Sequence, residues 1–191
     1  MKIFIKNMVC TRCEMAVARI LDDLHIPYTS MKLGEVDSAH PLSDEKLKDL
    51  NQELRKMGFE ILGDAAQQQI EAVKNHIVQK IAGQDIPEDF MLSEFVSSRM
   101  NREYSSVSKL FSQHVGITLE QYFILQKIEK IKELLFYNEY TVSEIAVILG
   151  YKSVQHLSAQ FKNTTGLTPT QFKKLKENTR KTIDSIHQSQ R

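Results

Sequence analysis

The spacing of apolar and polar positions divides the chain into two parts of different character. In residues 1–63, short runs with an apolar centre alternate with stretches in which apolar residues recur every three or four positions. The first pattern is typical of strands and the second of amphipathic helices. Together they predict strand 2–6, helix 12–24, a strand-like segment 28–36 with a bend or hairpin at Gly34, a helix from Ser43 to Gly58, and strand 59–62. This order predicts a small α+β sandwich.

After Gly63 only the helical period remains, so residues 64–178 are predicted to form an all-α domain. The apolar face of a first helix, over residues 64–82, consists of Ile70, Val73, Ile77 and Ile81. A second long helix is predicted over residues 119–137. Residues 179–191 form a polar tail. Because almost no flexible linker separates the two parts, a change in the first part could reach the second through a stiff helix.

The helical part repeats itself. A set of positions recurs fifty residues later: Val107, Ser108, Phe111, Gly116, Ile117, Thr118 and Tyr122 correspond to Leu157, Ser158, Phe161, Gly166, Leu167, Thr168 and Phe172. Upstream, Val96, Met100 and Asn101 correspond to Ile145, Leu149 and Gly150 at an offset of 49. Two structurally equivalent units are therefore predicted, with one residue gained or lost in a turn.

Each unit has the shape of a helix-turn-helix. In the second, helix 142–149 ends at Gly150 and a tight turn leads to helix 153–165. The second helix of such a motif can lie in the major groove, where Gln bonds adenine edges and Ser bonds bases or phosphates. The candidate DNA-binding residues are Tyr104, Ser105, Ser106, Ser108, Lys109 and Gln113 in the first unit, and Ser153, Gln155, His156, Ala159, Gln160 and Lys162 in the second.

The second unit resembles a known family. The segment TVSEIAVILGYKSVQHLSAQFKNTTGLTPTQFKK is similar to the second helix-turn-helix of AraC-type transcription regulators, through the pattern Phe161, Lys162, Gly166, Pro169 and Phe172. The resemblance covers about residues 67–176. It implies two helix-turn-helix units bridged by a long helix, which read adjacent major-groove segments of double-stranded DNA. By this resemblance, DNA-facing positions fall on Ser105, Ser108 and Lys109, and on Gln155, His156 and Ala159. Many members carry Arg where this chain has Ala159.

Charge and composition agree with a DNA-binding protein. The net charge of the chain is only +1, but residues 152–181 carry seven basic side chains and one acidic one. A polyanion would be drawn to this segment. Hydrophobic residues make up 41% of the chain and charged residues 26%, which is typical of a globular protein. The sequence shows no signal peptide and no apolar run long enough to span a membrane, so we expect a cytoplasmic protein with reduced cysteines.

Cys10 and Cys13 form a Cys-x-x-Cys motif between a predicted strand and a predicted helix. Two thiolates at this spacing can bind one soft ion, such as Cu(I) or Zn(II), and a helix N-terminus favours their deprotonation. Thiol redox chemistry, as a dithiol switch or a thioredoxin-like oxidoreductase, is a second interpretation. A vestigial domain that serves for dimerisation or small-ligand binding is a third. The two cysteines could also simply be small buried apolar residues.

The residues around the motif resemble a second family. MVCTRC, followed by a helix and by MGFEIL, is similar to the heavy-metal-associated domain of copper chaperones and metal-pumping ATPases, with matches at Met8, Cys10, Cys13, Gly58 and Phe59. The resemblance covers residues 1–63 and implies a ferredoxin-like βαββαβ sandwich. Asn7 replaces the usual Gly. The short segment between the two helices suggests that one central strand is shortened or lost.

The sequence thus predicts a transcription regulator and not an enzyme. A heavy-metal-associated-like sensor, residues 1–63, is joined to an AraC-like DNA-binding domain, residues 64–178. Soft-metal binding or thiol oxidation at Cys10 and Cys13 would change the orientation of the reading units or the oligomeric state. One chain could bind DNA alone, and the sandwich could pair two chains into a homodimer. The alternative is a non-enzymatic metal carrier whose helical half docks a protein partner.

Overall fold

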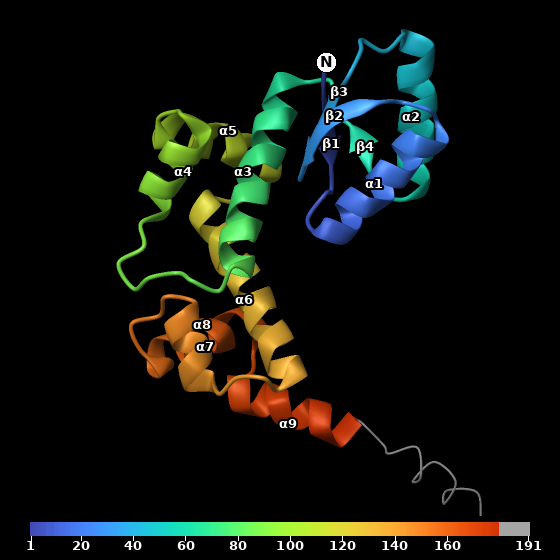
Figure 1. Cartoon of the computed structure of the whole chain (residues 1–191). Helices are drawn as coiled ribbons and strands as arrows, with labels where there is room; N and C mark the ends of the chain where they lie inside the picture. Colours follow the sequence, from blue (N-terminus) through green and yellow to red (C-terminus); the bar gives the residue numbers. More distant parts are fainter. Residues whose placement is uncertain (180–191) are drawn as a thin grey trace, which may run out of the picture. The chain divides into compact units, whose positions relative to one another are not determined.

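The computed structural model describes residues 1–179, with side chains to Leu175 (Figure 1). Contacts divide the chain into two compact units. The first consists of Met1–Gln79 and Leu92–Leu119, and the second of Lys80–Met91 and the chain from Glu120 onward. Thr179 is the last residue of the final helix. The rest of the predicted polar tail, residues 180–191, lies outside the described residues.

The N-terminal part of the first unit contains a four-stranded antiparallel sheet and two helices. Its elements follow the order β1 (Lys2–Lys6), α1 (Thr11–Asp23), β2 (Tyr28–Lys32), β3 (Glu35–Ser38), α2 (Asp44–Lys56) and β4 (Glu60–Ile61). The strands lie in the order β2-β3-β1-β4, and every neighbouring pair is antiparallel. The predicted α+β class of this part is therefore confirmed.

The segment between the two helices differs from the expectation of a shortened or lost strand. It forms a complete hairpin, in which Lys32 pairs with Glu35 across a turn at Leu33 and Gly34. Gly34 has φ +82°, the left-handed region that glycine adopts without a Cβ penalty. A two-residue turn needs so little chain that both strands fit.

One face of the sheet forms the core with α1 and α2. Alternate residues of a strand point to opposite faces, so Ile3 and Ile5 of β1 lie on the same side. They are fully or almost fully buried, together with Val17 and Leu21 of α1 and Leu50 and Leu54 of α2. The caps of α2 are as predicted. Ser43 Oγ accepts from the N–H of Lys46, and Gly58 follows the helix with φ +82°.

Helix α3 (Ala65–Ala82) packs next to the hairpin. Its predicted apolar face is confirmed, because Ile70, Val73, Ile77 and Ile81 are all buried. Asn75, also buried, donates from Nδ2 to the carbonyl of Leu33 at 3.3 Å. A Cβ on Gly34 would lie 2.5 Å from that same nitrogen. The missing side chain of Gly34 therefore permits the close approach of the helix.

The remaining described helices are two helix pairs, each followed by one further helix. Helices α4 (Leu92–Met100) and α5 (Tyr104–Val115) belong to the first unit. The second unit contains α6 (Leu119–Tyr137) from its second residue onward, α7 (Val142–Ile148), α8 (Val154–Thr165) and α9 (Pro169–Thr179). The predicted helix 119–137 is confirmed with the same bounds. No described helix combines the length and apolar character needed to cross a membrane.

Candidate DNA-reading faces and thiol pair

The sequence repeat corresponds to a repeat of backbone geometry. Helices α5 and α8 have twelve residues each and end at Gly116 and Gly166, both with φ +81°. The turns before them contain Asn101 and Gly150, which have φ 50° and φ 66°. The N–H of Arg102 bonds the carbonyl of Ser97, and 49 residues later the N–H of Tyr151 bonds that of Ala146. Each pair, α4–α5 and α7–α8, is therefore a helix–turn–helix of the same form.

The inward sides of the two units are equivalent as well. Val107 and Phe111 of α5 are buried, and so are their counterparts Leu157 and Phe161 of α8. Val96 of α4 and Ile145 of α7 are both fully buried. These buried positions pack α5 against α4 and α8 against α7. The opposite face of α5 and of α8 is therefore left to solvent or a partner.

In the first helix-turn-helix, α4–α5, most candidate residues lie on the exposed face of α5. Ser105, Ser106, Lys109 and Gln113 are exposed. Tyr104 and Ser108 are half-buried. The exposed side chains offer one positive charge, one amide and two hydroxyls, which are the groups that bond phosphates and base edges.

In the second helix-turn-helix, α7–α8, the exposed candidates are Gln155, His156, Ala159 and Lys162. Two other candidates are also engaged within the protein. Ser153 is the N-cap of α8, and its Oγ accepts from the N–H of His156 at 3.1 Å. Gln160 is half-buried, and its Oε1 accepts from the Tyr151 hydroxyl at 2.6 Å. The Gln160 amide group is thus held toward the turn, and the exposed set is centred on Gln155, Ala159 and Lys162.

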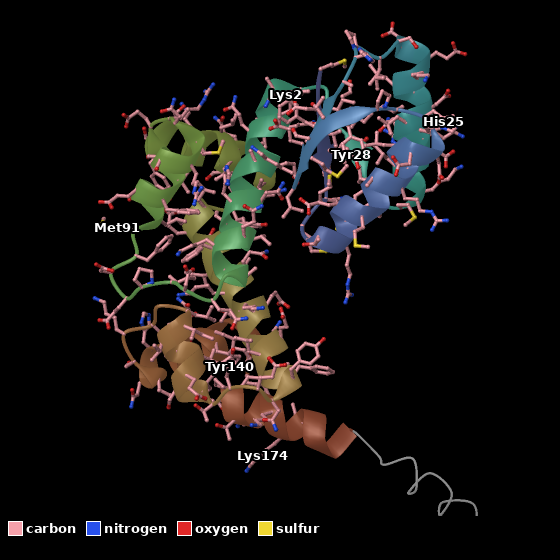
Figure 2. The ribbon with its side chains drawn as sticks, in the orientation of Figure 1. Lys2, His25, Tyr28, Met91, Tyr140 and Lys174 are labelled. Carbon is pink, nitrogen blue, oxygen red and sulfur yellow. The ribbon has the colours of Figure 1, made fainter. Side chains whose placement is uncertain are left out.

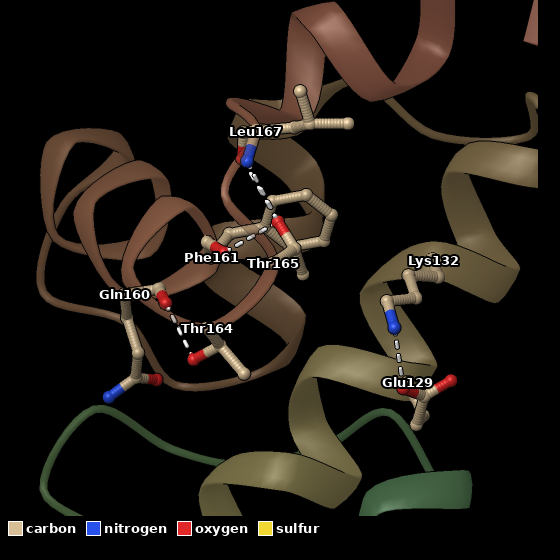
Figure 3. A network of polar contacts seen from close by, with 7 residues as sticks. All are labelled: Glu129, Lys132, Gln160, Phe161, Thr164, Thr165 and Leu167. Atoms are coloured by element: carbon tan, nitrogen blue, oxygen red, sulfur yellow. Dashed lines mark hydrogen bonds and ion pairs between the residues drawn. The ribbon is translucent and has the colours of Figure 1, made fainter. Parts of the chain in front are cut away.

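The far end of α8 is tied down by threonines (Figure 3). Thr164 donates to the carbonyl of Gln160 at 2.9 Å, and Thr165 donates to that of Phe161 at 2.8 Å. The N–H of Leu167 then donates to Thr165 Oγ1, just past the glycine that ends the helix. Thr168 and Gln171 bond each other as a cap for α9, in which Pro169 is the first residue. These bonds fix the helix behind the exposed face.

A buried lysine lies at the turn between α7 and α8 and is not among the residues that the sequence predicts to be functional. Lys127 of α6 is only 7% exposed, and its Nζ donates to the carbonyl of Leu149 at 2.9 Å. The same Nζ lies 3.7 Å from the centre of the Tyr151 ring, a cation–π contact. Burial lowers the pKa of Lys127 to about 8 and raises the pKa of Tyr151. The one signal in the sequence is a lysine inside the apolar stripe of α6.

The same turn is covered by the segment between α3 and α4. The N–H of Ile86 donates to the carbonyl of Ile148 at 3.1 Å, and Ile86 pairs with Leu149 as an isolated parallel bridge. A Cβ on Gly150 would lie 2.7 Å from the carbonyl oxygen of Pro87. Glycine is therefore required here both for its positive φ and for space.

Cys10 and Cys13 lie together at the N-terminus of α1. Cys10 is the N-cap residue and is exposed, Cys13 is half-buried, and the two Sγ atoms are 3.5 Å apart. Hydrogen bonds from the backbone N–H and the thiol of Cys13, with help from Arg12, lower the pKa of the Cys10 thiol. The interpretation of both cysteines as buried apolar residues is wrong, because Cys10 is exposed. Met8 is fully buried, and Phe59 almost so.

Asn7, where the sequence differs from the heavy-metal-associated pattern, has a left-handed backbone conformation. Its φ is +69°, a region that Asn tolerates better than most residues. Its Nδ2 donates to the carbonyl of Gly58 at 2.9 Å, which ties the cysteine loop to the end of α2. Within the described residues, no group of three or more His, Cys, Asp and Glu side chains is placed to hold a metal.

Comparison with known proteins identifies the helical part. A family model described as a helix-turn-helix domain matches residues 96–175. Those residues form a helix-turn-helix domain. The xylose operon regulatory protein of Escherichia coli K12 is 30% identical over 98 residues, 51% of this chain and 24% of that protein. An uncharacterized HTH-type transcriptional regulator of Staphylococcus aureus MSSA476 is 31% identical over 86 residues, 45% of this chain and 11% of that protein.

Solved structures similar to the helix-turn-helix domain include two transcription factors. One is the DNA-binding domain of AdpA in complex with a target DNA, with 19% identity and a TM-score of 0.49, covering 57% of this chain and 96% of that one. Another is an AraC-type regulator from Chromobacterium violaceum, with 16% identity and a TM-score of 0.49, covering 61% and 100%. The chain spans about a quarter or less of the two curated relatives given above. The heavy-metal-associated interpretation of residues 1–63 stays a prediction.

Proposed function

We propose that this protein is a sequence-specific, DNA-binding transcription regulator of the AraC type that acts in the bacterial cytoplasm. The observation that carries the proposal is the pair of geometrically equivalent helix-turn-helix units, each with a polar exposed face on its second helix. The regulators named for the matching relatives support it. Two units in one chain give two reading helices without a partner subunit, and each would enter one major-groove segment.

The exposed residues divide between two roles in DNA binding. Lys109 and Lys162 are exposed cations on the two reading helices and would contact phosphates, which position a protein without selecting sequence. Gln155 is exposed in the first turn of α8 and would bond a base edge, where an adenine offers both an acceptor and a donor. Ala159 offers only an apolar contact, such as one to a thymine methyl group.

The test begins with selection of bound sequences from a random DNA library by the purified chain. Affinity for the selected DNA should fall steeply with salt, because phosphate contacts release counterions. Lys109→Ala and Lys162→Ala should weaken binding to every sequence and reduce the salt dependence, each by about one phosphate contact. Gln155→Ala should relax sequence preference at about one base pair, with a cost of about 1–3 kcal/mol on the preferred site.

Lys48→Ala serves as the matched control, because Lys48 is an equally exposed lysine on α2, outside the helix-turn-helix domain. This variant should bind DNA like the native chain. If no sequence is enriched and no affinity falls with salt, the chain is not a DNA-binding regulator. The alternative of a metal carrier whose helical half docks a protein partner would then be favoured.

The proposed role of residues 1–63 is that of a sensor with a ferredoxin-like, heavy-metal-associated-like fold. Its support is the βαββαβ order, the sheet order β2-β3-β1-β4 and the paired thiols at the start of α1. Two thiolates suit Cu(I), a soft ion that accepts two sulfur ligands. Zn(II) prefers four ligands, and the described part of one chain brings no third ligand to the pair. Cu(I) is therefore the ion that we propose for this site.

Thiol oxidation is the second candidate effector, because the two Sγ atoms are only 3.5 Å apart and the pKa of Cys10 is lowered. The Cys10 thiolate would attack a disulfide oxidant, such as glutathione disulfide, and release one thiolate. The Cys13 thiolate would then attack Cys10 Sγ and release the second. Cys10 and Cys13 would lose two electrons in total, and the oxidant would become two thiols.

The two effectors are separated by the metal content of protein purified without oxygen and under reduction. Retention of one Cu(I) per chain, lost in the variant with both Cys10→Ser and Cys13→Ser, supports the metal sensor. A metal-free protein whose DNA affinity changes only after treatment with glutathione disulfide supports the redox switch. Equal DNA affinity under all of these conditions would remove both forms of the sensor proposal and leave the DNA-binding proposal intact.

A further inference from the structure

A groove with an apolar floor runs between α1 and α2 of the sandwich. Its volume is about 520 Å³. The lining residues are of two kinds, apolar ones and charged ones: Met15, Ala16, Ile20 and Met57, and Arg19, Asp23, Glu53 and Lys56. None of them takes part in the thiol pair or in the helix-turn-helix domain. The groove is therefore a separate surface that the proposed function does not use.

Two large apolar side chains at this groove are unusually open to solvent. Met15 is 69% exposed and Met57 is 60% exposed. Met15 lies in α1, and Met57 is the residue that directly follows α2. Methionine has three rotatable bonds and a polarisable sulfur, which suits it to contact with another protein surface. Exposed apolar side chains that gather at a groove are typical of an interaction site.

The charges around the groove indicate what kind of surface would cover it. Helix α1 carries Arg19 and Asp23 one turn apart, and α2 carries Glu53 and Lys56 one turn apart. Each helix thus contributes one charge of each sign to the lining of the groove, and these four lining charges sum to zero. Glu53 and Lys56 pair with each other at 2.6 Å. Among the described residues, neither Arg19 nor Asp23 forms an ion pair with any other side chain.

A helix with opposite charges one turn apart is complementary to an antiparallel copy of itself. In a twofold symmetric contact, a residue i that meets residue j is matched by a j that meets i. If two α1 helices cross antiparallel, Arg19 of each chain lies beside Asp23 of the other. A strongly acidic or basic partner would instead favour a rim of one sign.

We propose that this groove is a homodimer interface, occupied by α1 of a second copy of the chain. Ile20 lies between the two charges in sequence and would be near the twofold axis. Met15 and Met57 would be covered at the two ends of the contact, and two Arg19–Asp23 ion pairs would flank it. The dimer would join two chains through their sandwiches, and so it needs neither Cu(I) nor DNA to form.

The experiment is a charge exchange, measured by analytical ultracentrifugation of the full chain without DNA. The native chain should dimerise with increasing concentration. Arg19→Asp makes positions 19 and 23 both acidic, and Asp23→Arg makes both basic, so each variant alone should self-associate more than about tenfold more weakly. An equimolar mixture of the two variants should form a heterodimer, because every cross-chain pair then has opposite signs. The double variant R19D/D23R should dimerise like the native chain.

A second pair of variants tests the apolar part of the interface. Met15→Glu should abolish dimerisation, whereas Met91→Glu should not, because Met91, labelled in Figure 2, is a comparably exposed methionine that does not line the groove. Circular dichroism of each variant establishes that it is folded. A native chain that stays monomeric at all concentrations overturns the proposal, and so does a mixture of R19D and D23R that associates no better than its components. Neither result bears on DNA binding by the two reading units of one chain.

Discussion

At the residue scale, Lys127 is the side chain that the amino-acid pattern explains least. On α6 it is followed by Ile128 and, one turn later, by Ile131, and both of these isoleucines are buried in the core. The carbonyl of Leu149 and the ring of Tyr151 favour the charged ammonium group. Burial disfavours it more strongly and lowers the pKa to about 8. No sequence rule gives this result, because the environment comes from residues more than twenty positions away.

This pKa predicts how stability depends on pH. In the unfolded chain Lys127 has its ordinary pKa of about 10.4. Between about pH 8 and pH 10.4 the unfolded state therefore binds more protons than the folded state, and the free energy of unfolding rises with pH. The contribution is fully present above the unfolded pKa and is lost as pH falls through the folded pKa. Its slope is at most about 1.4 kcal/mol per pH unit.

Urea unfolding of the native chain and of Lys127→Met at several pH values in this window measures the effect. The difference in unfolding free energy between the two proteins should change in favour of the native chain as pH rises. Lys132→Met is the matched control, because Lys132 lies on the same helix but its side chain is 32% exposed and pairs with Glu129. A pH-independent difference for Lys127→Met would contradict the lowered pKa.

At the scale of elements, the helices of the C-terminal half could be predicted because their signals are local. Each copy of the repeated pattern, the glycines that end α5 and α8, and the apolar faces lie within single helices or adjacent turns. The sequence predicts the hairpin only as one strand-like segment, 28–36, with a bend or hairpin at Gly34. Engagement of Gln160 by Tyr151 could not be predicted, because it depends on how the turn packs against α8.

A comparison of Gly150 with Gly116 tests the packing of the turn between α7 and α8. Gly150 and Gly116 both have positive φ, so Ala at either position costs about 1 kcal/mol in backbone strain. Gly116 has no atom within 4 Å of a built Cβ, whereas Gly150 would meet backbone atoms of Ile86 and Pro87 at 2.7 to 2.9 Å. Gly150→Ala should therefore destabilise the chain by about 1–3 kcal/mol more than Gly116→Ala in thermal unfolding. Equal losses of stability in the two variants would mean that Ile86 and Pro87 are not packed against Gly150.

At the scale of the whole molecule, the compact units do not coincide with the division between sandwich and helices. The sandwich, α3 to Gln79 and the first helix-turn-helix, α4–α5, belong to one unit. In the proposed function, a change at Cys10 and Cys13 would act on α5 through the unit that contains them both. Inside that unit, Asn75 is 7% exposed and bonds the hairpin carbonyl of Leu33. The sequence indicated a stiff connection through residues 64–82 but not this lateral bond.

Asn75→Ala should thus weaken the response of DNA binding to the effector while leaving both binding events in place. The measured quantity is the ratio of DNA affinities with and without Cu(I), or with and without disulfide oxidation, which expresses the coupling free energy. The ratio should move toward one in Asn75→Ala, and effector binding at Cys10 and Cys13 should remain stoichiometric. Gln79→Ala is the control, because Gln79 lies four residues after Asn75 on α3 but is exposed. An unchanged ratio in Asn75→Ala would show that the signal reaches the reading helix by another route. The DNA affinity of each variant without effector shows whether the variant is still folded.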